Sequence, residues 1–190
     1  MIRRMALAIV LGTISAGMAG AQDVFKADLA HAHVGFEVSH MVISKVKGHF
    51  KDFDSTVTLD EAGQLSSVTA VIKVESIDTA QEKRDEHLRG TDFFDAAQYP
   101  EIRFESDGVE EGFLLGKLSL HGVTKDVKLP YTLKGPINDP WGKTKLGLEL
   151  DGIIDRTDYG LTWSKVMEAG GLVVGNEVAL SISVEFEKHE

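Results

Sequence analysis

The feature that most constrains the fold is an alternation of apolar and polar residues with a period of two. Near the C-terminus every second residue from Val178 to Phe186 is apolar, and most residues between them are Ser or Glu. Segments 65–77, 124–135 and 143–155 alternate in the same way. Because successive side chains of a strand point to opposite faces, each segment has one apolar face and one polar face exposed to solvent. This pattern is typical of antiparallel sheets.

Turn-forming residues separate the alternating segments. Gly, Asn, Asp and Pro gather at 60–64, 106–112, 121–126 and 134–143, where we expect the chain to reverse. We therefore predict an all-β fold of eight antiparallel strands, with a further short piece near residues 24–25. The predicted strands cover residues 33–42, 46–60, 65–77, 101–107, 112–121, 124–135, 143–155 and 176–188.

One segment departs from the period of two. The run Thr79–Glu82 matches a capping box, in which the first and last side chains bond the free amides of a helix start. Gly90 is suited to end such a helix in the left-handed conformation. We predict one short helix around residues 79–90, in the crossover between two strands, with Arg84 and Asp85 anchoring it over one end of the fold.

Eight such strands can form a sandwich or close into a barrel, and we favour the barrel because closure removes the exposed edges. Strands of about 12 residues at a tilt of about 40° give a barrel about 30 Å tall. The inward rows are mostly Val, Leu, Ile and Ala, which suits an extended apolar ligand. Periodicity alone does not distinguish a hollow lumen from one packed with side chains.

The first 21 residues have the pattern of a secretory signal peptide. Arg3 and Arg4 precede an apolar run, and small residues end it at Ala19–Ala21. The run is short for a membrane span, which needs about 20 residues. We predict cleavage after Ala21, a single mature domain over 22–190, and no stable membrane insertion.

Charge and composition exclude several classes of function. Without residues 1–21 the chain has 18 Lys and Arg against 30 Asp and Glu, a formal charge of −12. Such a surface repels phosphate backbones, so we expect no nucleic-acid partner. The sequence has no Cys, which excludes disulfides, thiolate metal sites and a cysteine nucleophile.

Several short motifs together resemble the YceI-like family of periplasmic, lipocalin-like barrels. They occur in order along nearly all of the mature chain, and their order is more specific than any one of them. A departure is Ala32, where the family often has Ser. The matching pieces are Asp28, His31, Val34, Phe36, Val38 and His40; Gly48 and Phe50; RDEHL and DFFDAAQYPEIRF within 84–104; Gly116, Leu118 and His121–Thr124; and Arg156–Gly160.

The resemblance implies an eight-stranded antiparallel lipocalin-like β-barrel that binds a polyisoprenoid or similar long-chain lipid, such as an isoprenoid quinone, in the periplasm. It implies no established catalysis. We predict no catalytic residues, no metal and no cofactor, and we include a homodimer among the predicted partners. Aromatic residues of the segment 79–100 and of the loop 156–171 are expected near the ligand. The predicted ligand-contacting residues are Phe36, Val38, His40, Phe93, Phe94, Phe104, Leu118, Leu120, Tyr131, Leu148, Tyr159, Trp163, Leu180 and Ile182.

Two alternatives remain open from the residues themselves. The first is an enzyme acting on an isoprenoid or quinone, with His31, His40 or Asp85 as a base. The second is a metal-handling protein, because His31 and His33 share one strand face and two further histidines lie nearby in sequence. No carboxylate or Cys completes a recognised metal-binding spacing around these histidines.

Overall fold

The computed structural model describes residues 22–168 and 170–189; the predicted signal peptide, 1–21, lies outside them. The described part is rich in strands and has one α-helix. The strands are β1 (Asp23–His40), β2 (Ser44–Phe50), β3 (Phe53–Leu59), β4 (Leu65–Lys73), β5 (Ile77–Asp78), β6 (Glu101–Glu110), β7 (Phe113–Leu120), β8 (Val123–Asn138), β9 (Thr144–Asp155) and β10 (Val174–Lys188).

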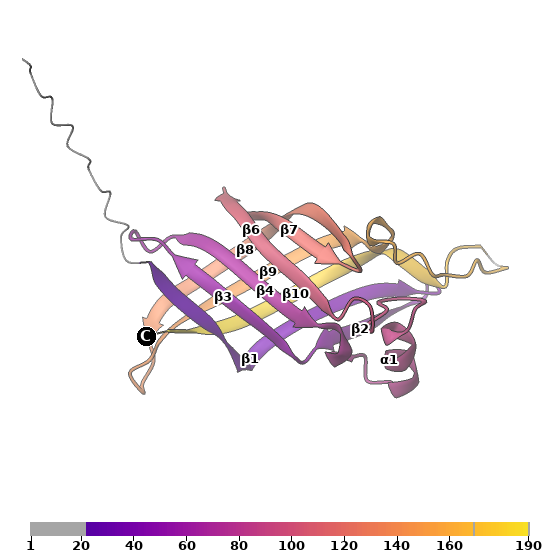
Figure 1. Ribbon diagram of the computed structural model, residues 1–190, viewed down its shortest axis with the longest axis horizontal. Helices are drawn as coiled ribbons and strands as arrows, with labels where there is room; N and C mark the ends of the chain where they lie inside the picture. Colours follow the sequence, from indigo (N-terminus) through magenta and orange to yellow (C-terminus); the bar gives the residue numbers. More distant parts are fainter. Residues whose placement is uncertain (1–21, 169, 190) are drawn as a thin grey trace, which may run out of the picture.

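These strands form one closed antiparallel barrel. Neighbours follow the order β10-β9-β8-β7-β6-β4-β3-β1, and β1 pairs with β10 to close the ring (Figure 1). The strands cross the long axis of the molecule obliquely (Figure 1), as closure of a sheet requires. The predicted eight-stranded antiparallel barrel with one helix is confirmed.

The barrel differs from the prediction where β1 meets β2 and β3. β1 is one long strand: its first residues pair with β3 and its last with β2, with an irregularity between Ala27 and Ala32. The predicted strand 46–60 is broken at Lys51 and Asp52. There the amide of Lys51 donates to the carbonyl oxygen of Ser76 and the carbonyl of Asp52 accepts from Lys73. The wall therefore splits, with β3 continuing along β4 while β2 pairs with β5.

The helix α1 (Glu82–Arg89) lies beside β2 at one end of the barrel (Figure 1). The predicted capping box is wrong: the N-cap is Gln81, whose side chain accepts from the amide of Arg84 at 2.5 Å. The predicted left-handed Gly90 is also wrong, since its φ of −75° and ψ of 176° continue the chain in an extended conformation.

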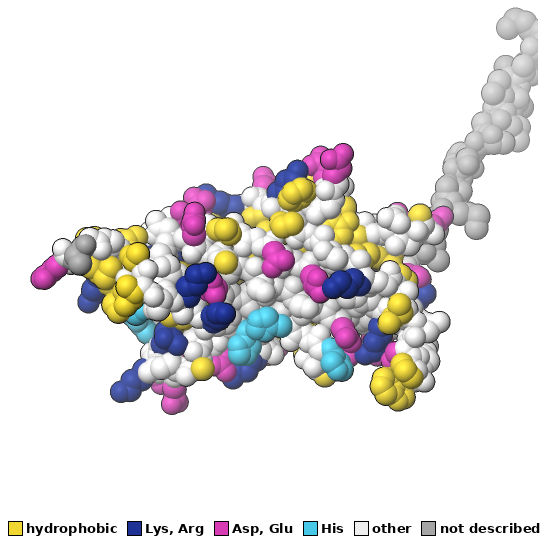
Figure 2. Space-filling model, turned by 180° about the vertical axis from the view of Figure 1, so that it is seen from behind, with side chains coloured by type: hydrophobic (Ala, Val, Ile, Leu, Met, Phe, Trp, Pro, Cys, Tyr) yellow, Lys and Arg dark blue, Asp and Glu magenta, His cyan; other side chains and the backbone are white. Residues whose placement is uncertain are grey.

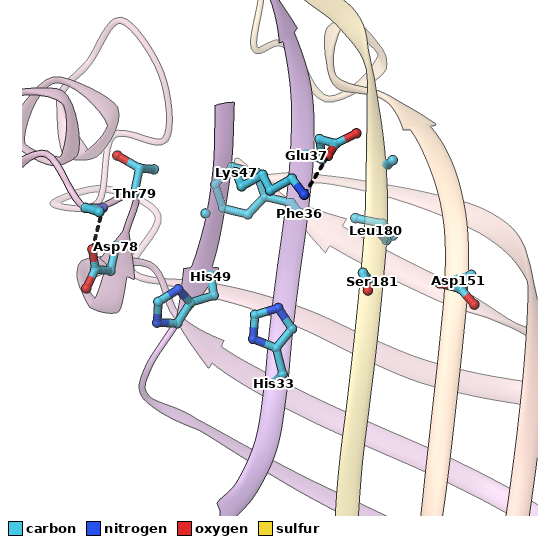
Figure 3. A pocket seen from close by; sticks show the side chains of 13 residues that line it. His33, Phe36, Glu37, Lys47, His49, Asp78, Thr79, Asp151, Leu180 and Ser181 are labelled. Atoms are coloured by element: carbon cyan, nitrogen blue, oxygen red, sulfur yellow. Dashed lines mark hydrogen bonds and ion pairs between the residues drawn. The ribbon is translucent and has the colours of Figure 1, made fainter. Parts of the chain in front are cut away.

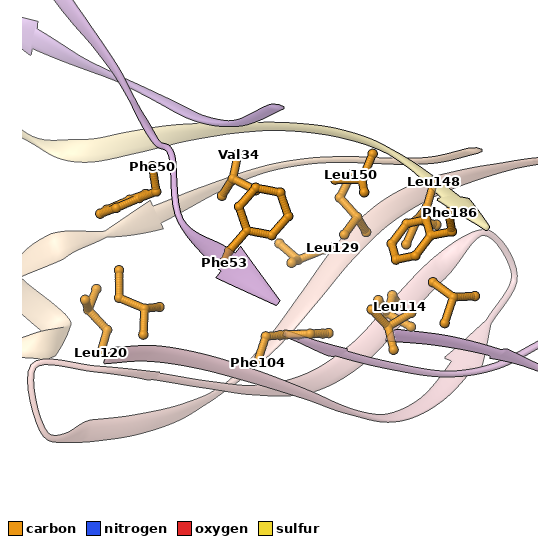
Figure 4. Close-up of a cluster of buried hydrophobic side chains, with 14 of the residues drawn as sticks. Val34, Phe50, Phe53, Phe104, Leu114, Leu120, Leu129, Leu148, Leu150 and Phe186 are labelled. Carbon is orange, nitrogen blue, oxygen red and sulfur yellow. The ribbon is translucent and has the colours of Figure 1, made fainter. Parts of the chain in front are cut away.

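The outer surface carries acidic and basic side chains side by side, without one broad basic patch on the face shown in Figure 2. The inner face holds the core, which runs the length of the barrel (Figure 4). Most of its least exposed side chains lie toward the end that holds the β3–β4 turn and the C-terminus, while Val74 and Ile77 lie near α1. Those below 2% exposure include Phe25, Val57, Leu59, Leu114 and Phe186.

Candidate functional site

The barrel encloses an apolar cavity of about 70 Å³. Fifteen side chains from the strands of the closed ring line it, and all but one of them are hydrocarbon. The lining residues are Val34, Phe53, Ser55, Val68, Ala70, Ile72, Phe104, Leu118, Leu129, Leu148, Leu150, Leu180, Ile182, Val184 and Phe186.

The single polar side chain in this lining leaves no unsatisfied group in the lumen. Ser55 is 7% exposed, and its hydroxyl donates to the carbonyl oxygen of Thr69 at 2.9 Å. A buried hydroxyl without such a partner costs free energy. The lumen therefore offers a ligand only dispersion contacts and release of water from apolar surface.

The cavity is much smaller than a lumen that holds an extended lipid chain, and the sequence had left open whether the lumen is hollow or packed. A volume of about 70 Å³ is roughly twice the ~30 Å³ that one water molecule occupies in the liquid, and half of the ~150 Å³ apolar cavity that holds benzene. Ala70, Ile72 and Leu118 nevertheless keep half-buried side chains although they face inward. The lumen is partly filled, and its packing is loosest along these strands.

Aromatic rings pack together at the end of the barrel next to α1. His87, Phe93 and Trp163 pack together with centroids 5.0–5.1 Å apart, which ties the segment after α1 to the loop that precedes β10. Phe94 instead points toward the barrel and meets Phe50. The two adjacent phenylalanines thus point in different directions.

The helix is anchored by a compact polar network. Asp85 is 5% exposed, and one of its carboxylate oxygens accepts from the amide and the hydroxyl of Thr79 at 2.9 and 2.5 Å. The guanidinium of Arg84 donates to the hydroxyl and carbonyl oxygens of Thr79, both at 2.7 Å. The predicted anchoring role of Arg84 and Asp85 is confirmed. These bonds hold α1 against the chain that follows β5.

A buried arginine holds the long loop that follows β9. Arg156 is 4% exposed, and its guanidinium donates to the carbonyl oxygens of Gly175, Val174 and Leu161. Burial lowers the pKa of Arg156, and the neighbouring Asp155 opposes that shift. Because three backbone carbonyls surround the charge, its role here is to fix the loop that carries Trp163.

The structure distributes the fourteen predicted ligand-contacting residues over three places. Phe104, Leu118, Leu148, Leu180 and Ile182 line the cavity. Phe36, Leu120 and Tyr131 belong to or pack against the same core. The others lie toward the α1 end: Val38 and His40 near the end of β1, Phe93 and Phe94 after α1, and Tyr159 and Trp163 in the loop.

Ten cavity-lining residues were not among those predictions. Most of them lie in the alternating segments, so the period of two places them on the inner face but does not show which level of the barrel stays open. Phe53 and Ser55 follow the interruption between β2 and β3, which the alternation of the sequence does not reveal. The residues are Val34, Phe53, Ser55, Val68, Ala70, Ile72, Leu129, Leu150, Val184 and Phe186.

His31 belongs to an exposed polar cluster on the outside of the barrel. Its Nδ1 lies 3.0 Å from a carboxylate oxygen of Asp28 and 3.8 Å from one of Glu185. The ammonium of Lys145 lies 2.8 Å from the same oxygen of Asp28. Hydrogen bonds from Lys145 first, and from His31 second, lower the pKa of Asp28 to about 2. The charge of Asp28 in this cluster is thus balanced by Lys145.

Comparison with known proteins decides the family. The family model described as YceI-like domain matches residues 25–186. The chain belongs to the YceI-like family. A UPF0312 protein of Yersinia pestis is 38% identical to this YceI-like chain over 194 aligned positions, covering 97% of each.

Solved structures agree with this assignment. The YceI protein of Campylobacter jejuni superposes with a TM-score of 0.70 and 32% identity, over 80% of this chain and 90% of that one. A domain of Saccharophagus degradans described as polyisoprenoid binding superposes with a TM-score of 0.62, over 87% of this chain and 98% of that one. At 17% identity the second likeness shows a shared fold.

Across residues 22–168 and 170–189, none of the helices has the length and apolar character needed to cross a membrane.

Proposed function

We propose that this YceI-like chain is a binding protein that holds a polyisoprenoid or a similar long-chain lipid in its lumen. The observation that carries the proposal is the cavity lining, in which fourteen of fifteen side chains are hydrocarbon and the remaining hydroxyl is already bonded. Such a lining has no group that could orient a polar metabolite. The polyisoprenoid-binding description of the Saccharophagus degradans domain, which shares the fold, supports the same ligand class.

Binding of a lipid chain requires the lumen to widen. The free volume of about 70 Å³ does not accommodate a prenyl chain. Widening is least costly where inward side chains are half-buried, as at Leu180 and Ile182 on β10 and at Ala70 on β4. Burial of lipid surface at about 25 cal/mol per Å² provides the driving force, and packing contacts with the chain replace those lost inside the barrel.

The polar residues favour binding over catalysis. An acid–base catalyst must reach a proton of its substrate. The Asp85 carboxylate and the Arg84 guanidinium are bonded to Thr79 outside the cavity lining. We therefore propose no catalytic role for them.

The identity of the lipid and the cellular compartment of the protein are further parts of the proposal. An isoprenoid quinone fits the proposed ligand class, with its prenyl tail in the lumen and its ring toward the aromatic end. We propose that the domain works in the periplasm after removal of residues 1–21, on the basis of the leader pattern in the sequence. A homodimer stays a prediction.

Extraction of the natively produced protein tests the proposal. The full chain is expressed with its own leader, purified without detergent and extracted with organic solvent for mass spectrometry. We expect close to one prenyl lipid per chain. Protein that is folded and carries no lipid, or carries a mixture of membrane phospholipids in proportion to their abundance, would overturn the proposal.

A matched pair of variants ties the ligand to the lumen. Ala70→Leu adds a side chain to the inner face of β4, and Thr69→Leu adds one to its outer face. We expect A70L to lower the amount of bound lipid severalfold and T69L to leave it unchanged. Overpacking costs about 1–3 kcal/mol of stability, so the folded state of each variant is checked by circular dichroism. Equal lipid content in both variants would mean that the lipid binds outside the lumen.

A further inference from the structure

Two histidines lie together on the outer face of the barrel. His33 of β1 and His49 of β2 have ring centroids 5.6 Å apart with an angle of 35° between the rings. Figure 3 shows the two imidazoles side by side on neighbouring strands, and histidine side chains gather on the outer face seen in Figure 2. His33 is exposed and His49 is half-buried, so both ring edges are accessible to a small solute.

A glycine makes this approach of the two rings possible. Gly35 stands directly opposite His49 in the pairing of β1 with β2. A Cβ added at Gly35 would lie 2.2 Å from Nε2 of His33. The imidazole of His33 therefore lies across the bare backbone of Gly35, on the side where His49 is paired. Any larger residue at position 35 would displace the ring.

The separation of the rings matches two imidazoles on one metal ion. A metal bound at about 2.0–2.1 Å to a ring nitrogen lies about 3.2 Å from the ring centroid, so two ligating imidazoles at an open tetrahedral angle have centroids roughly 5–5.6 Å apart. The observed distance is 5.6 Å. We propose that His33 and His49 form a surface chelate for a divalent transition metal ion such as Zn²⁺ or Cu²⁺, whose preferred nitrogen ligand is imidazole.

The surroundings leave room for a metal ion and its water ligands. The histidines border an open hollow of about 570 Å³, which Asp78 and Asp151 also line. Asp78 stands opposite His49 in the pairing of β2 with β5. One of its oxygens accepts from Ala80 at 2.7 Å and the other meets the ammonium of Lys51 at 2.6 Å. The metal therefore has two imidazole ligands, with water completing its coordination unless Asp78 exchanges Lys51 for the ion.

The other cluster of candidate metal ligands is less suited to a cation. Asp28, His31 and Glu185 bring their ligand atoms within 4.8 Å of one another. The ammonium of Lys145 already lies 2.8 Å from Asp28 and 3.9 Å from Glu185. A metal ion there would have to expel this charge. At the His33–His49 pair the ring centroids lie 5.6 Å apart, and an ion bound between the two imidazoles does not have to displace Lys145.

Titration of the full-length mature protein with Zn²⁺ tests the site. Isothermal titration calorimetry is run on the wild type and on His33→Asn and His49→Asn. We expect one Zn²⁺ per chain and at least about a tenfold loss of affinity in each variant, because either histidine alone loses the high local concentration of its partner. Electron paramagnetic resonance of the Cu²⁺ complex should show two imidazole nitrogens in the wild type and one in each variant.

Two further variants distinguish this site from the cluster at Asp28 and His31. Gly35→Ala keeps both histidines but pushes the His33 ring aside, so Zn²⁺ affinity should again fall several-fold. His31→Asn removes the imidazole of the other cluster and should leave the Zn²⁺ affinity unchanged. The proposal is overturned if the wild type binds no Zn²⁺ above the level of H33N, or if H31N removes the binding. Melting temperatures without metal show that each variant is folded.

Discussion

The ring of Phe94 stands nearly perpendicular to that of Phe50, with centroids 6.0 Å apart. The ring centroid of Phe50 in turn lies 5.8 Å from that of Phe36, which packs against the core of the barrel. Edge-to-face contacts of this kind are worth about 0.5–1.5 kcal/mol beyond the area they bury. These three rings therefore connect the segment after α1 with the interior of the barrel.

This connection predicts different results for Phe93 and Phe94. Phe94→Ala removes the ring that faces the barrel, and we expect bound lipid to dissociate about tenfold faster, which corresponds to about 1.4 kcal/mol. Phe93→Ala removes a ring that is 7% exposed and packed between His87 and Trp163, so we expect a loss of about 3 kcal/mol of stability.

Release of a fluorescent prenyl probe and unfolding in urea measure the two effects. Both phenylalanines are predicted ligand contacts, and the burial of Phe93 favours a role in the packing of this end. If both variants lose stability and probe to the same extent, Phe94 is also simply part of the core.

Arg156 is expected to hold the loop between β9 and β10 in place. In Arg156→Lys one ammonium replaces a guanidinium that donates to three carbonyl oxygens, so at least one buried carbonyl is left without a partner, at about 1–3 kcal/mol. Hydrogen exchange should show faster exchange in residues 161–175 and little change in β3 and β4. Uniform acceleration throughout the barrel would contradict a local role.

The lowered pKa of Asp28 predicts a contribution to stability that depends on pH. Its pKa in the folded state is about 2 against an ordinary value of 3.8. The contribution is therefore complete above about pH 4 and is lost as the pH falls toward 2. Because the side chain is 23% exposed, we expect about 1 kcal/mol rather than the full value of the shift.

Lys145→Gln should remove most of this dependence, since the hydrogen bond from Lys145 is its main cause. Urea unfolding at pH 6, 4 and 3 measures how the free energy of unfolding depends on pH. Lys143→Gln is the control, because it removes an exposed pair with Glu187 that should contribute little. Parallel pH curves for wild type and K145Q would show that the Asp28–Lys145 bond does not persist in solution.

The closed barrel could be predicted from the sequence because alternation is a local property of each strand. From Val178 to Phe186 every inward residue is visible in the printed sequence, and the structure places these residues against β1 and β9. The turn at His121 and Gly122 is equally local, with both residues at positive φ as a tight hairpin requires.

Features that depend on contacts between distant segments could not be predicted in this way. The break at Lys51 and Asp52 arises from bonds to Ser76 and Lys73, more than twenty residues away. The helix begins later than the predicted capping box, because the Thr79 hydroxyl bonds Arg84 and Asp85 instead of capping the first turn. The free volume of the lumen depends on how side chains from opposite walls meet, which no periodicity records.

Gly48 illustrates such a contact and gives a last prediction. A Cβ at Gly48 would lie 2.4 Å from Cζ of Phe36 and 2.8 Å from Cγ2 of Thr79. Gly48→Ala must therefore displace the ring of Phe36 or the anchor of α1, and we expect a loss of about 2 kcal/mol, as for other overpacked cores.

Gly147→Ala on β9 is the matched control, because its nearest neighbour would be Cβ of Lys134 at 3.9 Å, an ordinary contact. That substitution should be neutral or slightly stabilising. The double variant Gly48→Ala, Phe36→Leu should recover much of the loss, since the smaller side chain makes room for the added methyl group. A double-mutant cycle from urea unfolding measures this coupling. Additive effects of the two substitutions would show that the clash lies with Thr79 and the anchor of α1 instead.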